Sequence, residues 1–171
     1  SLLISKKYGT FLALGGIITN ADLEHNTKEE SNRCHNCDKC QKACPLAALD
    51  QPYVLNVKKC MSYLLQNENL PKKIQIVMEN RVADCEICQE SCPWNRKHLD
   101  NPLVTKMTES FQKKIGDWEQ FFYLPDLVEL SEKGYRKKLG QLNTDIPYKI
   151  FHRNILIAME RAKKVGEMAN K

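Results

Sequence analysis

The stretch that decides the fold is CHNCDKCQKACP, which runs from Cys34 to Pro45. Its four cysteines are separated by two, two and three residues, and a proline follows the last of them. Three thiolates on such a tight loop can reach three corners of one face of a cube-shaped [4Fe–4S] cluster, while the fourth points away from it. The spacing therefore predicts two iron-sulfur clusters, as in bacterial ferredoxins that carry a pair.

A second stretch, CEICQESCPWN from Cys85 to Asn95, repeats most of the first. Its three cysteines follow three cysteines of the first stretch at a constant offset of 48 positions, and a glutamine and a proline match as well. The matched pairs are Cys37 with Cys85, Cys40 with Cys88, and Cys44 with Cys92. The opening cysteine has no counterpart, because Val82 occupies that position. Cys60 is the one cysteine left, and it completes a set of eight.

The eight cysteines divide into two sets of four if each stretch lends its last cysteine to the other cluster. We expect one cluster on Cys34, Cys37, Cys40 and Cys92, and the other on Cys44, Cys60, Cys85 and Cys88. Two four-cysteine zinc sites are an alternative, because paired C-x-x-C units bind zinc, although zinc does not require the crossing. Four disulfides are a further alternative. The lack of a secretory signal and the absence of cysteines from the second half of the chain argue against them.

The composition sets wider limits on the function. The chain has 171 residues, of which 42% are hydrophobic, enough for one ordinary domain or two small ones. The formal charge of +5 would fall to about +1 if each cluster site added about −2, so any basic surface is local. The longest apolar run, FLALGGII, is too short to span a membrane. Because oxygen-sensitive clusters and free thiols need a reducing compartment, we expect a soluble, cytoplasmic protein.

Hydrophobic periodicity predicts a mainly α fold around and after the cysteines. We expect a strand or buried turn at FLALGGIIT, helices over 57–66 and 71–82, and a helix over 103–115. An apolar stripe at three-and-four spacing continues from Trp118 to Leu130. Ser131 predicts the N-cap of a helix that ends at Gly140, and a last helix begins near Pro147 and runs toward Lys164, with Gly166 just past it.

Several stretches together resemble the epoxyqueuosine reductases, cobalamin-dependent iron-sulfur enzymes of queuosine biosynthesis. LLISKKYGTFLALGGIITNADL is similar to the family's segment that leads out of the corrinoid-binding half, and KKCMSYLL to its isolated cysteine followed by serine and tyrosine. CHNCDKCQKACPLAALD and CEICQESCPWN resemble the two cluster stretches, and LPDLVELSEKGYRKKL with HRNILIAME resembles the closing helical repeat. The chain thus resembles the C-terminal half of the family's chain.

This resemblance implies a domain organisation and a reaction. Residues 1–27 would be a remnant of the corrinoid-binding domain and a linker, 28–100 a dicluster ferredoxin-like domain, and 101–171 a HEAT-like helical domain. The clusters would pass electrons to a corrinoid, which removes the epoxide oxygen of epoxyqueuosine in tRNA. Ser62 and Glu86 would contact the corrinoid, and Arg153 would help to hold tRNA phosphates. No catalytic residue is expected in this part, and the chain alone is expected to be inactive without the corrinoid-binding half.

Two other functions stay open. One is a non-catalytic dicluster ferredoxin-type module that carries electrons to another protein, and the other is a corrinoid-dependent reductase paralogue with another substrate. The expected partners are tRNA and an external electron donor, without a membrane, and the expected state is a monomer.

Overall fold

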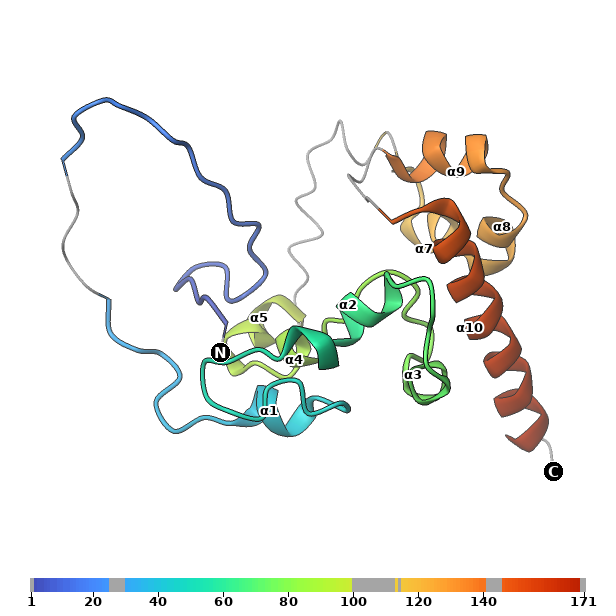
Figure 1. The fold of residues 1–171 in the computed structure, drawn as a ribbon, viewed down its shortest axis with the longest axis horizontal. Helices are drawn as coiled ribbons and strands as arrows, with labels where there is room; N and C mark the ends of the chain where they lie inside the picture. The colour runs from blue at the N-terminus through green and yellow to red at the C-terminus, as the bar shows by residue number, and fades with distance from the viewer. Residues whose placement is uncertain (1, 25–29, 100–112, 114, 141–145, 170–171) are drawn as a thin grey trace.

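The computed structural model describes residues 2–24, 30–99, 113, 115–140 and 146–169 (Figure 1). Over these residues the chain is helical, with two isolated β-bridges and no longer strand, so the prediction of a mainly α fold is confirmed. The helices are α1 Lys39–Ala43, η1 Val57–Lys59, α2 Met61–Leu65, α3 Lys72–Val77, α4 Ile87–Glu90, η2 Pro93–Asn95, α5 Arg96–Leu99, α7 Trp118–Phe121, α8 Leu124–Val128, α9 Glu132–Leu139 and α10 Tyr148–Ala169.

The internal repeat forms two short helices, α1 and α4, that pack against each other (Figure 1). Adding 48 to the residue numbers of α1 gives 87–91, and α4 covers Ile87–Glu90. Both helices end before a cysteine that precedes a proline, Cys44 in one case and Cys92 in the other. A residue before proline is restricted to extended backbone, and the ψ angles of these two cysteines are 113° and 125°.

The two helices expected between the cysteine stretches are shorter than their periodicity predicts. The first is interrupted at Cys60, whose ψ of 127° separates η1 from α2. The second begins after Pro71 as predicted but ends at Val77, and Glu79 then takes a left-handed φ of 53°. These helices still bury one apolar face, in a core formed by Met61, Leu65, Ile74 and Met78 with Ala158 of α10.

The second half of the chain forms its own core from α8, α9 and α10. Tyr135, Leu139 and Ile155 lie at its centre, each at most 5% exposed. Ser131 caps α9 as predicted, because its Oγ accepts the N–H of Gly134 at 3.2 Å. The last helix is longer than expected: α10 continues beyond Gly166 to Ala169. The helix predicted over 103–115 lies outside the described residues except for residues 113 and 115.

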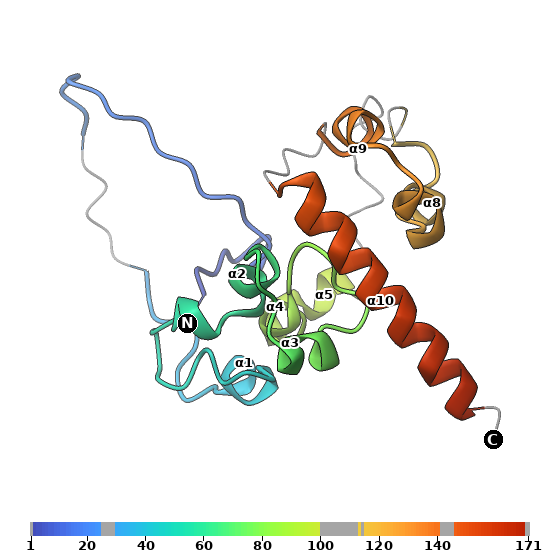
Figure 2. The same cartoon turned by 45° about the vertical axis from the view of Figure 1, so that its right-hand side comes forward.

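Helix α10 links the two cores. Figures 1 and 2 show its first turns beside α8 and α9 and its later turns passing α3. Asn154 is fully buried at the crossing, and its Nδ2 donates to the carbonyl oxygens of Leu65 at 2.9 Å and Val82 at 2.8 Å. This buried amide therefore helps to join the cysteine-bearing part to the tail.

Arg153 takes part in the same junction. Its guanidinium donates to the carbonyl oxygens of Asn67 at 2.7 Å and Leu65 at 3.2 Å, and also to that of Glu68. These carbonyls lie at the last residue of α2 and just after it, where a helix leaves acceptors without intrahelical partners. The expectation that Arg153 holds tRNA phosphates is corrected here, since its donors are used by the protein backbone.

The apolar run near the start is neither a strand nor a buried turn in the structure. Ile17 is 93% exposed and Ile18 is fully exposed, and residues 11–20 have no regular secondary structure. A Cβ added at Gly15 or Gly16 would meet nothing within 4 Å, and neither glycine has a positive φ. The prediction was wrong because a strand needs a second strand to pair with, and no described residue forms a β-bridge with this segment. No helix within the described ranges is long and apolar enough to cross a membrane.

Candidate iron-sulfur centres

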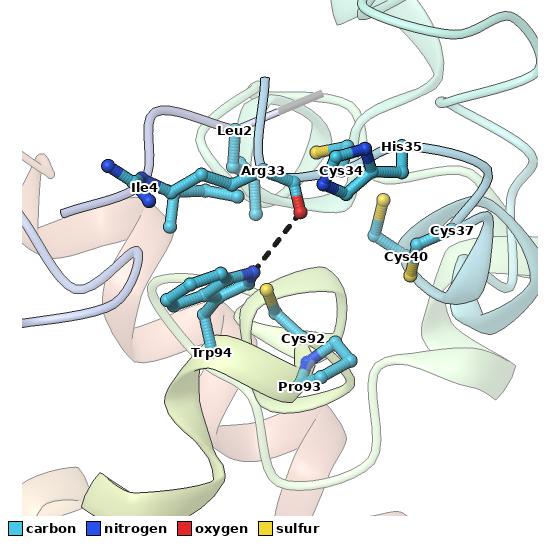
Figure 3. A pocket seen from close by; sticks show the side chains of 10 residues that line it. All are labelled: Leu2, Ile4, Arg33, Cys34, His35, Cys37, Cys40, Cys92, Pro93 and Trp94. Carbon is cyan, nitrogen blue, oxygen red and sulfur yellow. Dashed lines mark hydrogen bonds between the residues drawn. The ribbon is translucent and has the colours of Figure 1, made fainter. Parts of the chain in front are cut away.

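The eight cysteines are free thiols and line two cavities, four in each. The first cavity measures about 270 Å³ and is lined by Cys34, Cys37, Cys40 and Cys92 (Figure 3). The second measures about 100 Å³ and is lined by Cys44, Cys60, Cys85 and Cys88. This grouping is the one that the crossed assignment requires, while the ligation itself stays a prediction.

The two cavities differ in their other walls. The first also contains the polar side chains of Arg33, His35 and Trp94, and its Cys37 is exposed. The second is otherwise lined by apolar residues from the start of the chain, from the segment after Cys44, and from α2 and α4. These are Leu2, Pro45, Leu46, Ala48, Leu49, Leu55, Met61 and Ile87. The second cavity therefore has the more apolar lining of the two.

Local backbone bonds shape the loop that opens the first cavity. The N–H of Cys34 donates to Oδ1 of Asn32 at 2.9 Å, and the N–H of Cys37 donates to the carbonyl oxygen of Cys34 at 2.8 Å. His35 between them has a left-handed φ of 44°, which turns the chain tightly enough to bring these cysteines around one space. Helix α1 then carries Cys40 to the same cavity.

The first and second stretches meet at Trp94. Its indole Nε1 donates to the carbonyl oxygen of Arg33 at 3.3 Å, as the dashed line in Figure 3 marks. The guanidinium of Arg33 lies over the indole ring at 5.4 Å from its centroid and also pairs with Glu30 at 2.5 Å. This contact holds the residue before Cys34 close to the residue that follows Pro93.

The second cavity has corresponding contacts. The N–H of Cys85 donates to Oγ of Ser62 at 2.8 Å, which joins α2 to the loop before α4. The N–H of Ala48 donates to Sγ of Cys44 at 3.2 Å. A backbone N–H aimed at sulfur stabilises negative charge there, as iron-sulfur sites require.

The sulfur atoms are close enough to influence one another's ionisation. Burial, and after it the nearby sulfurs of Cys85, Cys40 and Cys60, raise the pKa of the Cys88 thiol to about 11. Burial also raises the pKa of Cys92, with Cys34, Cys40 and Cys37 adding to the effect. Crowded thiols of this kind resist becoming thiolates by themselves, so they need bound metal cations to hold the deprotonated form.

The donor set is consistent with a cluster. Thiolates are the usual ligands of [4Fe–4S] clusters, and four of them surround each cavity. Among the described residues, no three His, Cys, Asp or Glu side chains converge on the position of a single metal ion.

The two residues expected at the corrinoid lie on either side of Cys85. Ser62 is half-buried and accepts the Cys85 N–H. Glu86 is exposed as a residue, yet its neighbours desolvate the carboxyl and raise its pKa, and the nearby Glu90 and Asp84 raise it further. Both residues therefore lie next to Cys85, Ser62 through this hydrogen bond and Glu86 as its neighbour in the chain.

A buried polar cluster was not predicted from the sequence. Gln89 and Asn95 of the second cysteine stretch bond to each other and to Thr10, and Asn95 is fully buried. The one sequence feature that pointed to Asn95 was its position in the second stretch, directly after Trp94. Its partner Thr10 lies 85 positions earlier in the chain, and no rule of sequence spacing connects Thr10 with Asn95.

The cysteine-bearing part of the chain is similar to a known class of protein domain. Residues 33–95 match the family model of the 4Fe-4S double cluster binding domain. The part of the chain that carries the eight cysteines is therefore similar to double-cluster iron-sulfur domains.

The chain is furthermore related to the epoxyqueuosine reductases, as its sequence indicated. It is 41% identical to the epoxyqueuosine reductase of Listeria monocytogenes over 165 residues, which cover 95% of this chain and 41% of that protein. The structure of epoxyqueuosine reductase from Bacillus subtilis matches with a TM-score of 0.75 and 28% identity, over 92% of this chain and 41% of that chain. An epoxyqueuosine reductase structure with an epoxyqueuosine-modified tRNA-Tyr stem loop shares the fold, with a TM-score of 0.60 and 22% identity over 92% of this chain and 40% of that chain.

The lengths differ strongly. This chain spans 34 to 43% of the length of the first three curated relatives that it matches.

Proposed function

We propose that this chain is the iron-sulfur electron-relay part of an epoxyqueuosine reductase-type oxidoreductase. The observation that carries the proposal is the division of eight cysteines between two cavities, four in each, across segments that are far apart in sequence. A pair of [4Fe–4S] clusters would supply one-electron redox chemistry at these positions.

The proposed ligands follow the cavities. One cluster would be held by Cys34, Cys37, Cys40 and Cys92, and the other by Cys44, Cys60, Cys85 and Cys88. The packing of α1 against α4 keeps the two sets adjacent, and Cys40 of one set is near enough to Cys88 of the other to raise its pKa. Adjacent clusters suit electron transfer within one chain, without diffusion of a carrier.

The remaining features of the proposed function rest on the resemblance of the sequence to the epoxyqueuosine reductases. We propose cobalamin as a further cofactor, with Ser62 and Glu86 of this chain beside it, and epoxyqueuosine in tRNA as the substrate. One of the matched structures holds an epoxyqueuosine-modified tRNA stem loop, which supports tRNA as a partner. An external donor would supply electrons to a monomer in the cytoplasm, where the reducing conditions suit eight free thiols. We propose three parts: a remnant of the corrinoid-binding domain with a linker over 1–27, a dicluster domain over 28–100, and a helical domain over 101–171.

A second function is favoured by one observation. The matched family model covers residues 33–95 and describes cluster binding alone, which also fits a ferredoxin-type electron-transfer module without a reaction of its own. The structure of the tail favours the reductase part, because α10 is built into the cluster-bearing core through Asn154 instead of standing apart.

The first test is metal analysis. After anaerobic reconstitution we expect about eight iron and about eight sulfide per chain, since each [4Fe–4S] cluster holds four of each. Stoichiometric zinc in anaerobically purified protein would contradict both functions.

The second test separates the two functions. The complete protein that contains this chain is loaded with clusters and cobalamin, supplied with a reductant, and assayed on tRNA bearing epoxyqueuosine. Conversion that is lost in Cys60→Ser supports the reductase, whereas a fully loaded protein without turnover supports the module.

A further inference from the structure

Each set of four cysteines has beside it one hydrogen bond that joins distant segments. In the first cavity, Nε1 of Trp94 donates to the carbonyl oxygen of Arg33, 61 positions earlier. In the second, the N–H of Cys85 donates to Oγ of Ser62, 23 positions earlier. Both bonds connect a side chain near one cysteine of a set with the backbone at another cysteine of the same set.

The Trp94 bond connects the ends of the first set. Arg33 directly precedes Cys34, and Trp94 follows Cys92 by two residues, so the bond fixes the separation of these two cysteines. The guanidinium that covers the ring adds a second contact, and its side chain is only 13% exposed. The other two members of this set, Cys37 and Cys40, belong to the same short stretch as Cys34. Cys92 is thus the one member that tertiary structure must deliver, and Trp94 delivers it.

The Ser62 bond does the same for the second set. Ser62 follows Cys60 by two residues, and its acceptor oxygen holds the backbone of Cys85 itself at 2.8 Å. Cys60 is the member that lies outside both repeated stretches. The hydroxyl therefore ties the isolated cysteine to the stretch that supplies Cys85 and Cys88.

We infer that Trp94 and Ser62 are positioning residues, each of which holds together the ligands of one cluster and not the other. This inference rests on the proposed function, because it assumes that the two sets bind clusters. Its physical basis is that outer-shell hydrogen bonds orient metal ligands and that closing a long loop costs entropy on every rebinding. A set whose distant ligand is already held in place releases its cluster more slowly.

The experiment measures iron release from one cluster at a time. Cys60→Ser removes the cluster of the second set, so that only the first remains. Cys92→Ser removes the cluster of the first set, so that only the second remains. Into each background we place Trp94→Phe, which keeps an aromatic ring without the N–H, and Ser62→Ala, which removes the hydroxyl. The rate of iron release to a chelator is then followed anaerobically, with Ser62→Thr as the variant that retains a hydroxyl.

We expect each substitution to speed iron release from one set only. Trp94→Phe speeds iron release from the first set by roughly three- to tenfold, the range that one neutral hydrogen bond contributes, and leaves the second set unchanged. Ser62→Ala has the reverse pattern, and Ser62→Thr keeps the wild-type rate.

Other outcomes would overturn either the inference alone or the proposed function as well. Full iron loading with equal effects on both sets, with no effect, or with the two effects exchanged would overturn the inference and leave the proposed function standing. A wild-type chain that takes up no iron would overturn the proposed function, and the inference with it.

Discussion

Thr10 and Asn95 exchange two hydrogen bonds across 85 positions of sequence. The N–H of Thr10 donates to Oδ1 of Asn95 at 2.7 Å, and Nδ2 of Asn95 donates to Oγ1 of Thr10 at 2.7 Å. Nδ2 also donates to the carbonyl oxygen of Gln89 at 2.8 Å. The amide thereby fixes the chain near its beginning against the end of the second cysteine stretch.

Asn95→Ala is expected to destabilise the folded protein. The substitution leaves the buried Thr10 N–H without an acceptor, and an unsatisfied buried group costs about 1–3 kcal/mol. The midpoint of thermal unfolding of the reconstituted protein measures the effect. Asn20→Ala in the exposed segment is the control and should leave the midpoint unchanged. Equal midpoints for both variants would show that the buried amide contributes nothing.

Gly9→Ala tests the close approach at the same contact. Gly9 has a φ of 66°, and a Cβ there would lie 2.0 Å from Oδ1 of Asn95. A non-glycine residue in such a conformation costs on the order of 1–3 kcal/mol before the clash is counted. Gly16→Ala is the matched control, because it has open space around it and no positive φ. We expect a clear fall in the unfolding midpoint for Gly9→Ala only, and a wild-type midpoint in that variant would contradict the described contact.

Cys60→Ser is expected to remove one cluster and keep the other. Only the second cavity contains Cys60, so iron should fall from about eight to about four per chain. Iron analysis and the electron paramagnetic resonance spectrum of the reduced protein give the count. Loss of all the iron, or of none, would speak against the crossed assignment.

Arg153→Met separates a structural role from a role in RNA binding. The substitution removes donors from three backbone carbonyls after α2, so it should lower the unfolding midpoint. Arg136→Met on α9 is the control, since Arg136 forms an exposed pair with Glu132 worth about 0.5 kcal/mol or less. A variant of unchanged stability but weaker tRNA binding would restore the phosphate role for Arg153.

Removal of iron should loosen one part of the protein more than the other. The cysteine stretches have short helices and depend on ligands from distant segments, whereas the tail has a core around Tyr135, Leu139 and Ile155. Hydrogen exchange before and after chelation should therefore show faster exchange over 33–65 and 81–95, and little change in α9 and the first turns of α10. Uniform acceleration along the chain would contradict this division.

The sequence predicted the helices best where local signals define their ends. Ser131 and Gly140 bracket α9 as expected, because capping depends on neighbouring residues. Periodicity did not reveal that Cys60 interrupts the helix over 57–66, since the break depends on where its thiol must point. The exposed run around Ile17 was misjudged because apolar composition alone does not say whether a partner is present.

The sequence alone predicted the division of the eight cysteines into two sets of four, each of which lines one cavity of the structure. Spacing within a stretch is fixed by covalent geometry, and the repeat at offset 48 is visible without a structure. Only the tertiary structure decided which side chains secure those sets. Trp94 against Arg33, Ser62 against Cys85, Asn95 against Thr10 and Asn154 against Leu65 join residues 23 to 89 positions apart. Such contacts depend on how the helices pack, and a local pattern of residues carries no information about packing partners at that distance.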